Sequence, residues 1–118
     1  MMGYIIYGLT NCNTTKAAIN WFKKNHVSYK LNNYKTDPPT KEKLENWCNQ
    51  LGWEKLLNKR GTAFQRLHPA IQQGATTQRN AIEIMELRPS TIKRPIIEKD
   101  NKIITIGFNE ILYNVHCL

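Results

Sequence analysis

The chain has 118 residues, of which 41% are hydrophobic, and it carries a formal net charge of +8 at pH 7. This length fits a single domain, which can bury a core without disulfide or metal support. No stretch approaches the length of a membrane-spanning helix, and the apolar run after Met1-Met2-Gly3 is too short for a signal peptide. We therefore expect a cytoplasmic protein that contacts no membrane.

The positive charge is concentrated near the N-terminus. Residues 1–36 carry five lysines and no acidic residue, whereas residues 95–118 have a net charge of −1. A basic surface either keeps a protein in solution or attracts an anionic ligand or an acidic partner, and both interpretations stay open. Direct nucleic-acid binding is not expected, because no aromatic or helix-turn-helix pattern accompanies the lysines.

The first part of the chain predicts a strand followed by a helix. Tyr4–Tyr7 is short, aromatic and β-branched, as in a buried central strand, and Gly8 ends it. A helix can begin at Thr14 or Thr15 and end near Asn25. Its apolar side chains share one face: Ala18, Trp21 and Phe22.

A second strand and a helical insertion are predicted next. Residues 27–31 alternate apolar and polar side chains, which is the period of a strand, and they complete a β-α-β unit. The insertion covers about residues 40–88. The segments expected to be helical run from Thr40 to Gly52, from Trp53 to Asn58, from Phe64 to Leu67, and from Thr76 or Thr77 to just before Pro89.

A β-hairpin and a short helix close the chain. Ile96–Glu98 and Ile103–Ile106 flank a polar turn, and Asn109 can cap the last helix. The order of elements predicts an α/β, thioredoxin-like fold, in which a β-α-β unit and a β-β-α unit share one mixed sheet. We expect one such domain over residues 1–118, interrupted by the helical insertion.

Cys12 lies between the first strand and the first helix, where a helix N-terminus can stabilise a thiolate. The thiolate is the nucleophile, and a drop of about two units from the free-thiol pKa of about 8.5 would leave it mostly ionised at pH 7. Cys48 falls on the apolar face of a predicted helix, and Cys117 is near the chain end. No two cysteines form a close pair, so we expect free thiols and no metal site.

Four segments, in this order, resemble those of a known family: Tyr7–Ala17, Leu56–Phe64, Ile92–Glu98 and Ile106–Phe108. Each segment alone is weak evidence for the resemblance, whereas the four segments together, in this order, are strong evidence for it. Over essentially the whole chain the sequence resembles the arsenate reductase-related family of ArsC, Spx and YffB proteins, and most of all its YffB-like branch.

The resemblance implies roles for several residues. Cys12 resembles the nucleophilic cysteine of the family. Arg60 resembles the arginine of the family's LLNxRGT segment, and Arg94 resembles the arginine just before the strand that follows it. Pro95 corresponds to the cis-proline of thioredoxin-like folds. Two guanidiniums near one thiolate would lower its pKa and would bind an oxyanion or the carboxylates of glutathione. Further substrate contacts are expected at the start of the helix, from Asn13, Thr14, Thr15 and Lys16.

Each of these roles has a structural alternative that the sequence leaves open. Arg60 could cap a helix or neutralise Glu54, and Arg94 could simply be an exposed residue before a strand. Pro95 could be an ordinary trans proline at the first residue of a strand. Lys16 could be a solvated helix residue, and the two threonines could be capping residues.

The function that the resemblance implies is a thiol-dependent reductase that works through Cys12 alone. The thiolate would form a mixed disulfide with its substrate, and a second thiol would resolve it. Glutathione or another small thiol is the expected co-substrate, an oxidised protein is a possible substrate, and no bound cofactor is expected. Cys117 is an internal alternative for the second thiol if the chain end folds back. We expect a monomer.

Two other activities of the family are alternatives. Arsenate reductases of the family bring a third arginine from the loop after the last strand, where this chain has Ile106–Glu110 and no arginine. Spx-like regulators bind RNA polymerase and often carry a CxxC redox switch, whereas residue 15 here is threonine. A thiol substrate is therefore favoured over arsenate, and a redox switch is disfavoured, although polymerase binding itself stays open.

Overall fold

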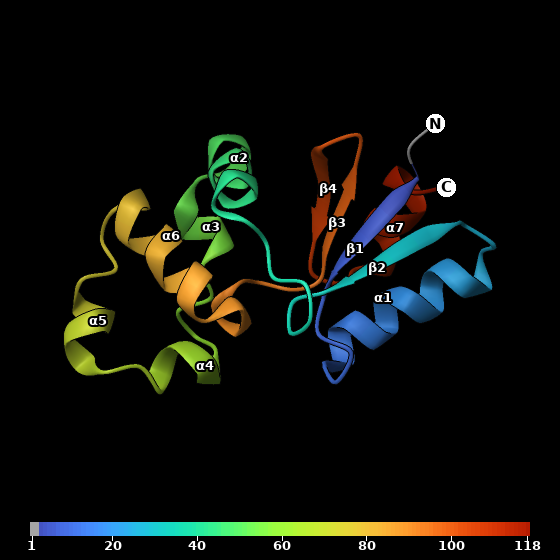
Figure 1. The fold of residues 1–118 in the computed structure, drawn as a ribbon. Helices are drawn as coiled ribbons and strands as arrows, with labels where there is room; N and C mark the ends of the chain where they lie inside the picture. Colours follow the sequence, from blue (N-terminus) through green and yellow to red (C-terminus); the bar gives the residue numbers. More distant parts are fainter. Residues whose placement is uncertain (1–2) are drawn as a thin grey trace. The chain divides into compact units, whose positions relative to one another are not determined.

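The computed structural model describes residues 3–118, which form two compact units (Figure 1). The first unit contains residues 3–37 and 94–118, and it holds all the strands of the sheet. The second unit contains residues 38–93 and is helical. The insertion expected at about residues 40–88 therefore falls within the second unit.

The first unit is built on a four-stranded sheet with the order β2-β1-β3-β4. β1 (Tyr4–Gly8) runs parallel to β2 (Tyr29–Asn33) and antiparallel to β3 (Ile96–Lys99). β3 in turn pairs antiparallel with β4 (Lys102–Ile106). The predicted mixed sheet is confirmed, and β1 lies at its centre with a neighbour on each side.

Local backbone geometry sets where the strands begin and turn. Asp100 and Asn101 have φ angles of 52° and 63°, the left-handed values that a two-residue hairpin turn of this kind requires. β2 begins at Tyr29, so the expectation of a strand from residue 27 was wrong. The N–H of Val27 donates to the carbonyl of Phe22 and is thereby still engaged in closing the preceding helix.

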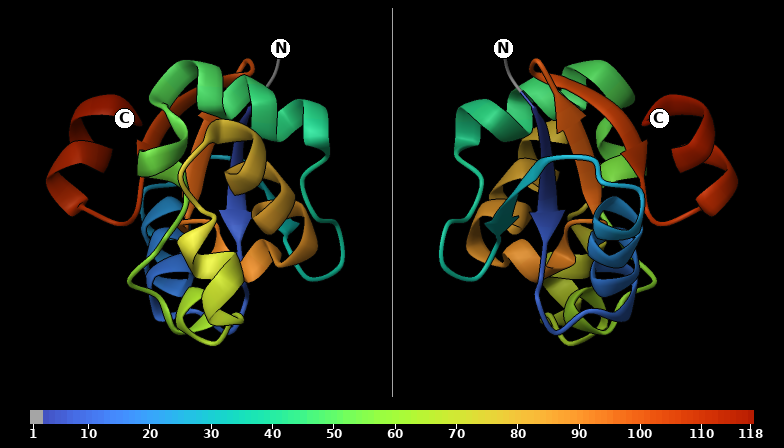
Figure 2. Two further views of the ribbon diagram at one scale, coloured as in Figure 1. Left: turned by 90° about the vertical axis from the view of Figure 1, so that its left-hand side faces the viewer. Right: turned by 90° about the vertical axis from the view of Figure 1, so that its right-hand side faces the viewer.

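Two helices pack on one face of the sheet. α1 (Asn13–Lys24) and α7 (Glu110–His116) lie next to each other there (Figure 2). Their shared core consists of Ile6, Ala18, Trp21, Phe22, Ile97, Tyr113 and Cys117. The rings of Trp21 and Tyr113 meet edge to face with their centroids 5.4 Å apart, which joins the two helices directly.

A buried polar pair lies within the sheet, between β1 and β3. The hydroxyl of Tyr7 donates to Oε1 of Glu98 at 2.9 Å, and the two side chains are 4% and 1% exposed. Burial, with the neighbouring carboxylate, raises the pKa of Tyr7 well above its usual value. Tyr34, which follows β2, is 1% exposed and interacts electrostatically with both Tyr7 and Glu98.

The second unit is a set of helices that mostly follow the predicted caps. Its elements are α2 (Lys41–Leu51), α3 (Trp53–Leu56), α4 (Thr62–Gln65), α5 (Pro69–Gln73), α6 (Gln78–Leu87) and the 3-10 helix η1 (Pro89–Thr91). The hydroxyls of Thr40 and Thr77 accept hydrogen bonds from the N–H groups of Lys43 and Asn80. Helix α5 was not predicted, because none of its residues is buried and it has no apolar stripe. Among residues 3–118, no helix combines the length and the apolar character needed to cross a membrane.

Replacement of Tyr7 by phenylalanine tests the buried pair. Tyr7→Phe removes one buried hydrogen bond to a carboxylate, so we expect a loss of about 1–3 kcal/mol in the free energy of unfolding, measured by urea denaturation. Tyr4→Phe is the matched control on the same strand, because its hydroxyl makes only an exposed 3.3 Å contact with the His116 carbonyl. Equal, small losses in both variants would show that the pair contributes nothing.

Candidate active site around Cys12

Cys12 occupies the N-cap position of α1, at the point where the chain leaves β1. The N–H of Lys16 donates to the Cys12 carbonyl at 2.9 Å, which closes the first turn of the helix. The expected capping roles of Thr14 and Thr15 were therefore wrong, because the helix begins one or two residues before them. Thr15 is fully buried against Gly8, where even a methyl group on Gly8 would lie 2.5 Å from the threonine hydroxyl oxygen. Glycine at this position thus lets the helix start close to the strand end.

The Cys12 sulfur is surrounded by hydrogen-bond donors from two parts of the first unit. Its Sγ lies 3.1 Å from the hydroxyl oxygen of Thr14. The Arg94 side chain and the N–H of Thr15 also reach the sulfur. Thr15 is the third residue of the helix, whose N–H is the usual donor to an N-cap side chain, although the geometry here falls short of a formal capping bond.

These donors set the protonation state of Cys12. Partial burial raises the pKa of the thiol, but hydrogen bonds from the Thr14 hydroxyl, the Thr15 N–H and the Arg94 side chain outweigh that effect, and the Thr15 hydroxyl contributes least. The resulting pKa is about 6, compared with about 8.5 for a free thiol. At pH 7 about nine tenths of Cys12 is therefore thiolate. The side chain is also partly exposed, so the nucleophile is accessible.

A cis peptide bond joins Arg94 and Pro95, directly before β3. The Thr14 hydroxyl also lies 3.3 Å from the Arg94 carbonyl oxygen, so its single proton is donated to that oxygen when Cys12 is a thiol and to the sulfur when Cys12 is a thiolate. The Pro95 carbonyl accepts from the N–H of Gly107 at 2.7 Å. A continuous set of contacts thus connects Cys12, through Thr14 and Arg94–Pro95, to the loop after β4.

The other sequence-predicted site residues differ in where they lie. Asn13, Thr14 and Lys16 are exposed at the start of α1, in the same unit as Cys12. Thr15 is buried, so its side chain offers no surface to a substrate. Arg60 is exposed, just before α4 in the second unit, and its role beside Cys12 stays a prediction.

The remaining cysteines have the opposite electrostatic character. Burial raises the pKa of Cys48 to about 11, with help from the nearby carboxylates of Glu45 and Glu54. Burial also raises the pKa of Cys117, an effect that Lys99 partly offsets. At neutral pH both thiols are therefore more fully protonated than a free thiol, which makes them weaker nucleophiles than Cys12.

Cys117 cannot act as the internal resolving thiol in this structure. It interacts with Tyr4, the first residue of β1, and with Lys99, the last residue of β3. Cys12 follows the opposite end of β1, and Figure 1 shows the C-terminus at the end of the sheet where β1 begins. Five strand residues separate the two ends by roughly 13 Å, whereas a disulfide needs Cα atoms within about 7 Å.

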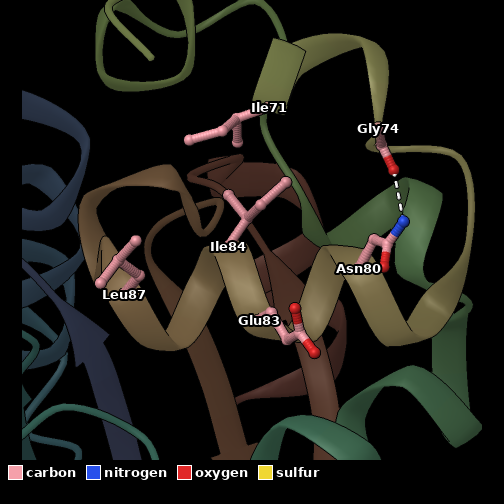
Figure 3. Close-up of a pocket in the computed structure, with 6 residues that line it drawn as sticks. All are labelled: Ile71, Gly74, Asn80, Glu83, Ile84 and Leu87. Atoms are coloured by element: carbon pink, nitrogen blue, oxygen red, sulfur yellow. Dashed lines mark hydrogen bonds between the residues drawn. The ribbon is translucent and has the colours of Figure 1, made fainter. Parts of the chain in front are cut away.

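Away from Cys12, residues 3–118 offer few other candidate binding or catalytic sites. A pocket of about 260 Å³ lies between α5 and α6 in the second unit, and Ile71, Ile84 and Leu87 line it (Figure 3). The Asn80 side chain at its edge is held by a 2.8 Å hydrogen bond to the Gly74 carbonyl. No group of three His, Cys, Asp or Glu side chains suited to a metal ion occurs within residues 3–118.

Comparison with known proteins agrees with this arrangement. The profile of the ArsC family matches residues 7–114. The chain belongs to the ArsC family. A Haemophilus influenzae protein of uncharacterised function is 35% identical over 105 residues, which are 89% of this chain and 90% of that one. The global transcriptional regulator Spx 2 of Oceanobacillus iheyensis is 27% identical over 89% of this chain and 76% of its own.

Solved structures of similar proteins confirm the thioredoxin-like α/β fold of this ArsC-family chain. The YFFB protein superimposes with a TM-score of 0.89 and 34% identity, covering 96% of this chain and 97% of that one. An arsenate reductase (ArsC) related protein from Brucella melitensis gives a TM-score of 0.77 and 33% identity, covering 98% and 95%.

Substitutions at Thr14 and Arg94 test which groups lower the Cys12 pKa. Thr14→Val and Arg94→Ala each remove a donor to the thiolate, so each should raise that pKa by about one unit, measured by thiolate ultraviolet absorbance against pH. Thr14→Ser keeps a hydroxyl and should keep the low value. A pKa in Thr14→Val equal to that of the wild type would exclude the hydroxyl as a stabilising donor.

Proposed function

We propose that this protein is a thiol oxidoreductase that uses Cys12 as its only nucleophile and glutathione as its co-substrate. The observation that carries the proposal is the position of Cys12, which is partly exposed at the N-cap of α1 with its sulfur 3.1 Å from the Thr14 hydroxyl oxygen, where hydrogen bonds lower its pKa to about 6. A thiol ionised at neutral pH is required for attack on a disulfide, and one whose pKa lies near ambient pH is close to the optimum. The reducing cytoplasm would supply the glutathione.

The reaction would proceed by two thiol–disulfide exchanges. The Cys12 thiolate attacks one sulfur of a substrate disulfide, an S–S bond forms between them, and the other sulfur leaves as a thiolate that takes up a proton. A glutathione thiolate then attacks the mixed disulfide, regenerates the Cys12 thiolate and carries away the substrate as a disulfide with glutathione. An external second thiol is needed because Cys48 and Cys117 are both buried.

Arg94 suits this chemistry in two ways. Its guanidinium stabilises the attacking thiolate, and the same fork of donors can bind a carboxylate of glutathione. The exposed N-terminal turn of α1 offers N–H groups to the same ligand. The loop after β4 contains no cation between Ile106 and Asn109, so a doubly charged oxyanion would lose one charge-assisted contact of about 1.5–3 kcal/mol relative to a three-arginine site. Disulfide reduction is therefore favoured over arsenate reduction.

Incubation with oxidised glutathione tests the proposal. We expect one glutathione adduct per chain, located at Cys12 by peptide mass spectrometry and released by added glutathione. Cys12→Ser should abolish the adduct, whereas Cys48→Ser should leave it unchanged because Cys48 is 4% exposed. Glutathione-dependent reduction of a small disulfide should follow the same pattern.

A regulatory role is the second candidate, because the chain matches global transcriptional regulators of the Spx group over 89% of its length. Recovery of RNA polymerase from lysate by the wild type and by Cys12→Ala alike would favour this candidate. Absence of any glutathione adduct at Cys12, together with that recovery, would contradict the oxidoreductase proposal.

A further inference from the structure

A shallow groove of about 290 Å³ runs along α1 in the first unit. Ala17, Asn20, Trp21 and Lys24 form its α1 side, and Phe108 and Glu110 form the other. Phe108 is 37% exposed, and its ring rests edge to face on Tyr113 with the centroids 5.0 Å apart. The groove therefore has an aromatic and aliphatic floor and one charge of each sign at its rim.

The groove and the candidate active site share helix α1, because Ala17 and Asn20 of the groove lie on the helix that Cys12 caps. Asn13, Ala17, Asn20 and Lys24 follow one another at helical spacing on the same side of α1, and Asn13 is the residue directly after Cys12. On the opposite side, Phe108 follows Gly107, whose N–H is bonded to the Pro95 carbonyl beside the thiol. Ala17 lies five residues after Cys12, which places the apolar part of the groove roughly 7.5 Å along the helix axis from the thiol.

This distance matches an extended peptide held by its cysteine at Cys12. At about 3.3–3.6 Å per residue, the side chain two positions from the substrate cysteine reaches roughly 7 Å, which is the level of Ala17 along α1. The exposed lysines of α1 are Lys16, Lys23 and Lys24, and residues 1–36 contain no acidic residue. The lining of the groove carries one charge of each sign, Lys24 and Glu110, but the surface of α1 around it is basic and favours an acidic partner.

We propose that the groove between α1 and Phe108 is a peptide subsite, which takes an apolar side chain two positions from the oxidised cysteine of an acidic protein substrate. This inference rests on the proposed oxidoreductase function and names its substrate class. Glutathione itself has no large apolar side chain and does not fill the groove. The subsite therefore selects the protein partner, whereas Cys12 and Arg94 carry the exchange reaction.

Activated peptides provide a direct test. Two acidic peptides differ only at the residue two positions before their cysteine, which is leucine in one and serine in the other, and each cysteine is coupled to thionitrobenzoate. The Cys12 thiolate attacks the peptide sulfur, the bond between the peptide and Cys12 forms, and coloured thionitrobenzoate leaves as its thiolate. The rates are divided by those with free glutathione, which corrects for the intrinsic reactivity of each peptide. Cys12→Ser supplies the background rate.

The wild type should react about tenfold faster with the leucine peptide, the lower end of the selectivity that an apolar pocket gives. Phe108→Ala should bring the ratio close to one. Ala17→Gln should also bring the ratio close to one, because the glutamine side chain fills the groove from the helix side. Agreement between the two variants would show that the effect does not come from a folding defect in Phe108→Ala. Ile111→Ala is the matched control, because Ile111 is an exposed α7 residue outside the groove, and it should keep the wild-type ratio.

The alternative outcomes separate the two proposals. Equal rates for both peptides in the wild type would overturn the subsite and leave the oxidoreductase proposal standing. No reaction of Cys12 with either peptide would overturn both. Equal rates after the acidic residues are replaced by lysine would overturn the preference for an acidic partner. A dimer in sedimentation that Ala17→Gln dissolves would assign the groove to a second copy of this chain instead.

Discussion

The competition between burial and hydrogen bonding at one sulfur atom governs the chemistry of this molecule. Burial favours the neutral thiol, and donors from Thr14, Thr15 and Arg94 favour the thiolate by a larger amount. Two of these donors belong to the first turn of α1, and the third is Arg94, two residues before the start of β3. The sheet determines whether they meet, because β1 delivers Cys12 and the neighbouring antiparallel β3 delivers Arg94 to the same end. The low pKa thus depends both on the local sequence after Cys12 and on the fold that brings Arg94 to it.

The sequence was sufficient to predict the elements that carry strong local signals. Thr40, Thr77 and Asn109 cap helices as their side chains suggest, and the two-residue turn of the β3–β4 hairpin follows from its polar residues. Cys12 was identified from its place between a predicted strand and a predicted helix, whereas Arg94 was identified only through the family segments. The helix start was misplaced because a threonine is the better cap by propensity, whereas the packing of Thr15 against Gly8 fixes the start at Cys12.

Long-range contacts were beyond the reach of the sequence. The Tyr7–Glu98 bond joins residues 91 positions apart, and the Thr14 hydroxyl meets the Arg94 carbonyl across 80 positions. Glu98 lies in a β-branched strand pattern where a polar residue is expected to face solvent, so nothing marked it as buried. For Cys117 the opposite holds. Its position near the chain end did not indicate whether it is buried, and only the packing of α7 shows that it belongs to the core.

The loop after β4 carries an aromatic side chain, Phe108, and no cation between Ile106 and Asn109. Phe108 is bonded through its neighbour Gly107 to the cis Arg94–Pro95 segment, so its position is tied to the thiol by main-chain contacts. An apolar side chain in place of a cation at such a position changes which ligands can bind beside the thiolate. It does not change the groups that stabilise the thiolate. This separation supports the view that Cys12 and Arg94 perform the chemistry and the loop selects the substrate.

The most direct test of the central claim is the pH dependence of iodoacetamide alkylation at each cysteine, measured by peptide mass spectrometry on the native wild-type protein. The account predicts that the Cys12 rate rises to half its maximum near pH 6 and is constant above about pH 8, while Cys48, with a pKa of about 11, reacts far more slowly throughout. A Cys12 rate that rises only between about pH 8 and 9, as for a free thiol, would contradict the account.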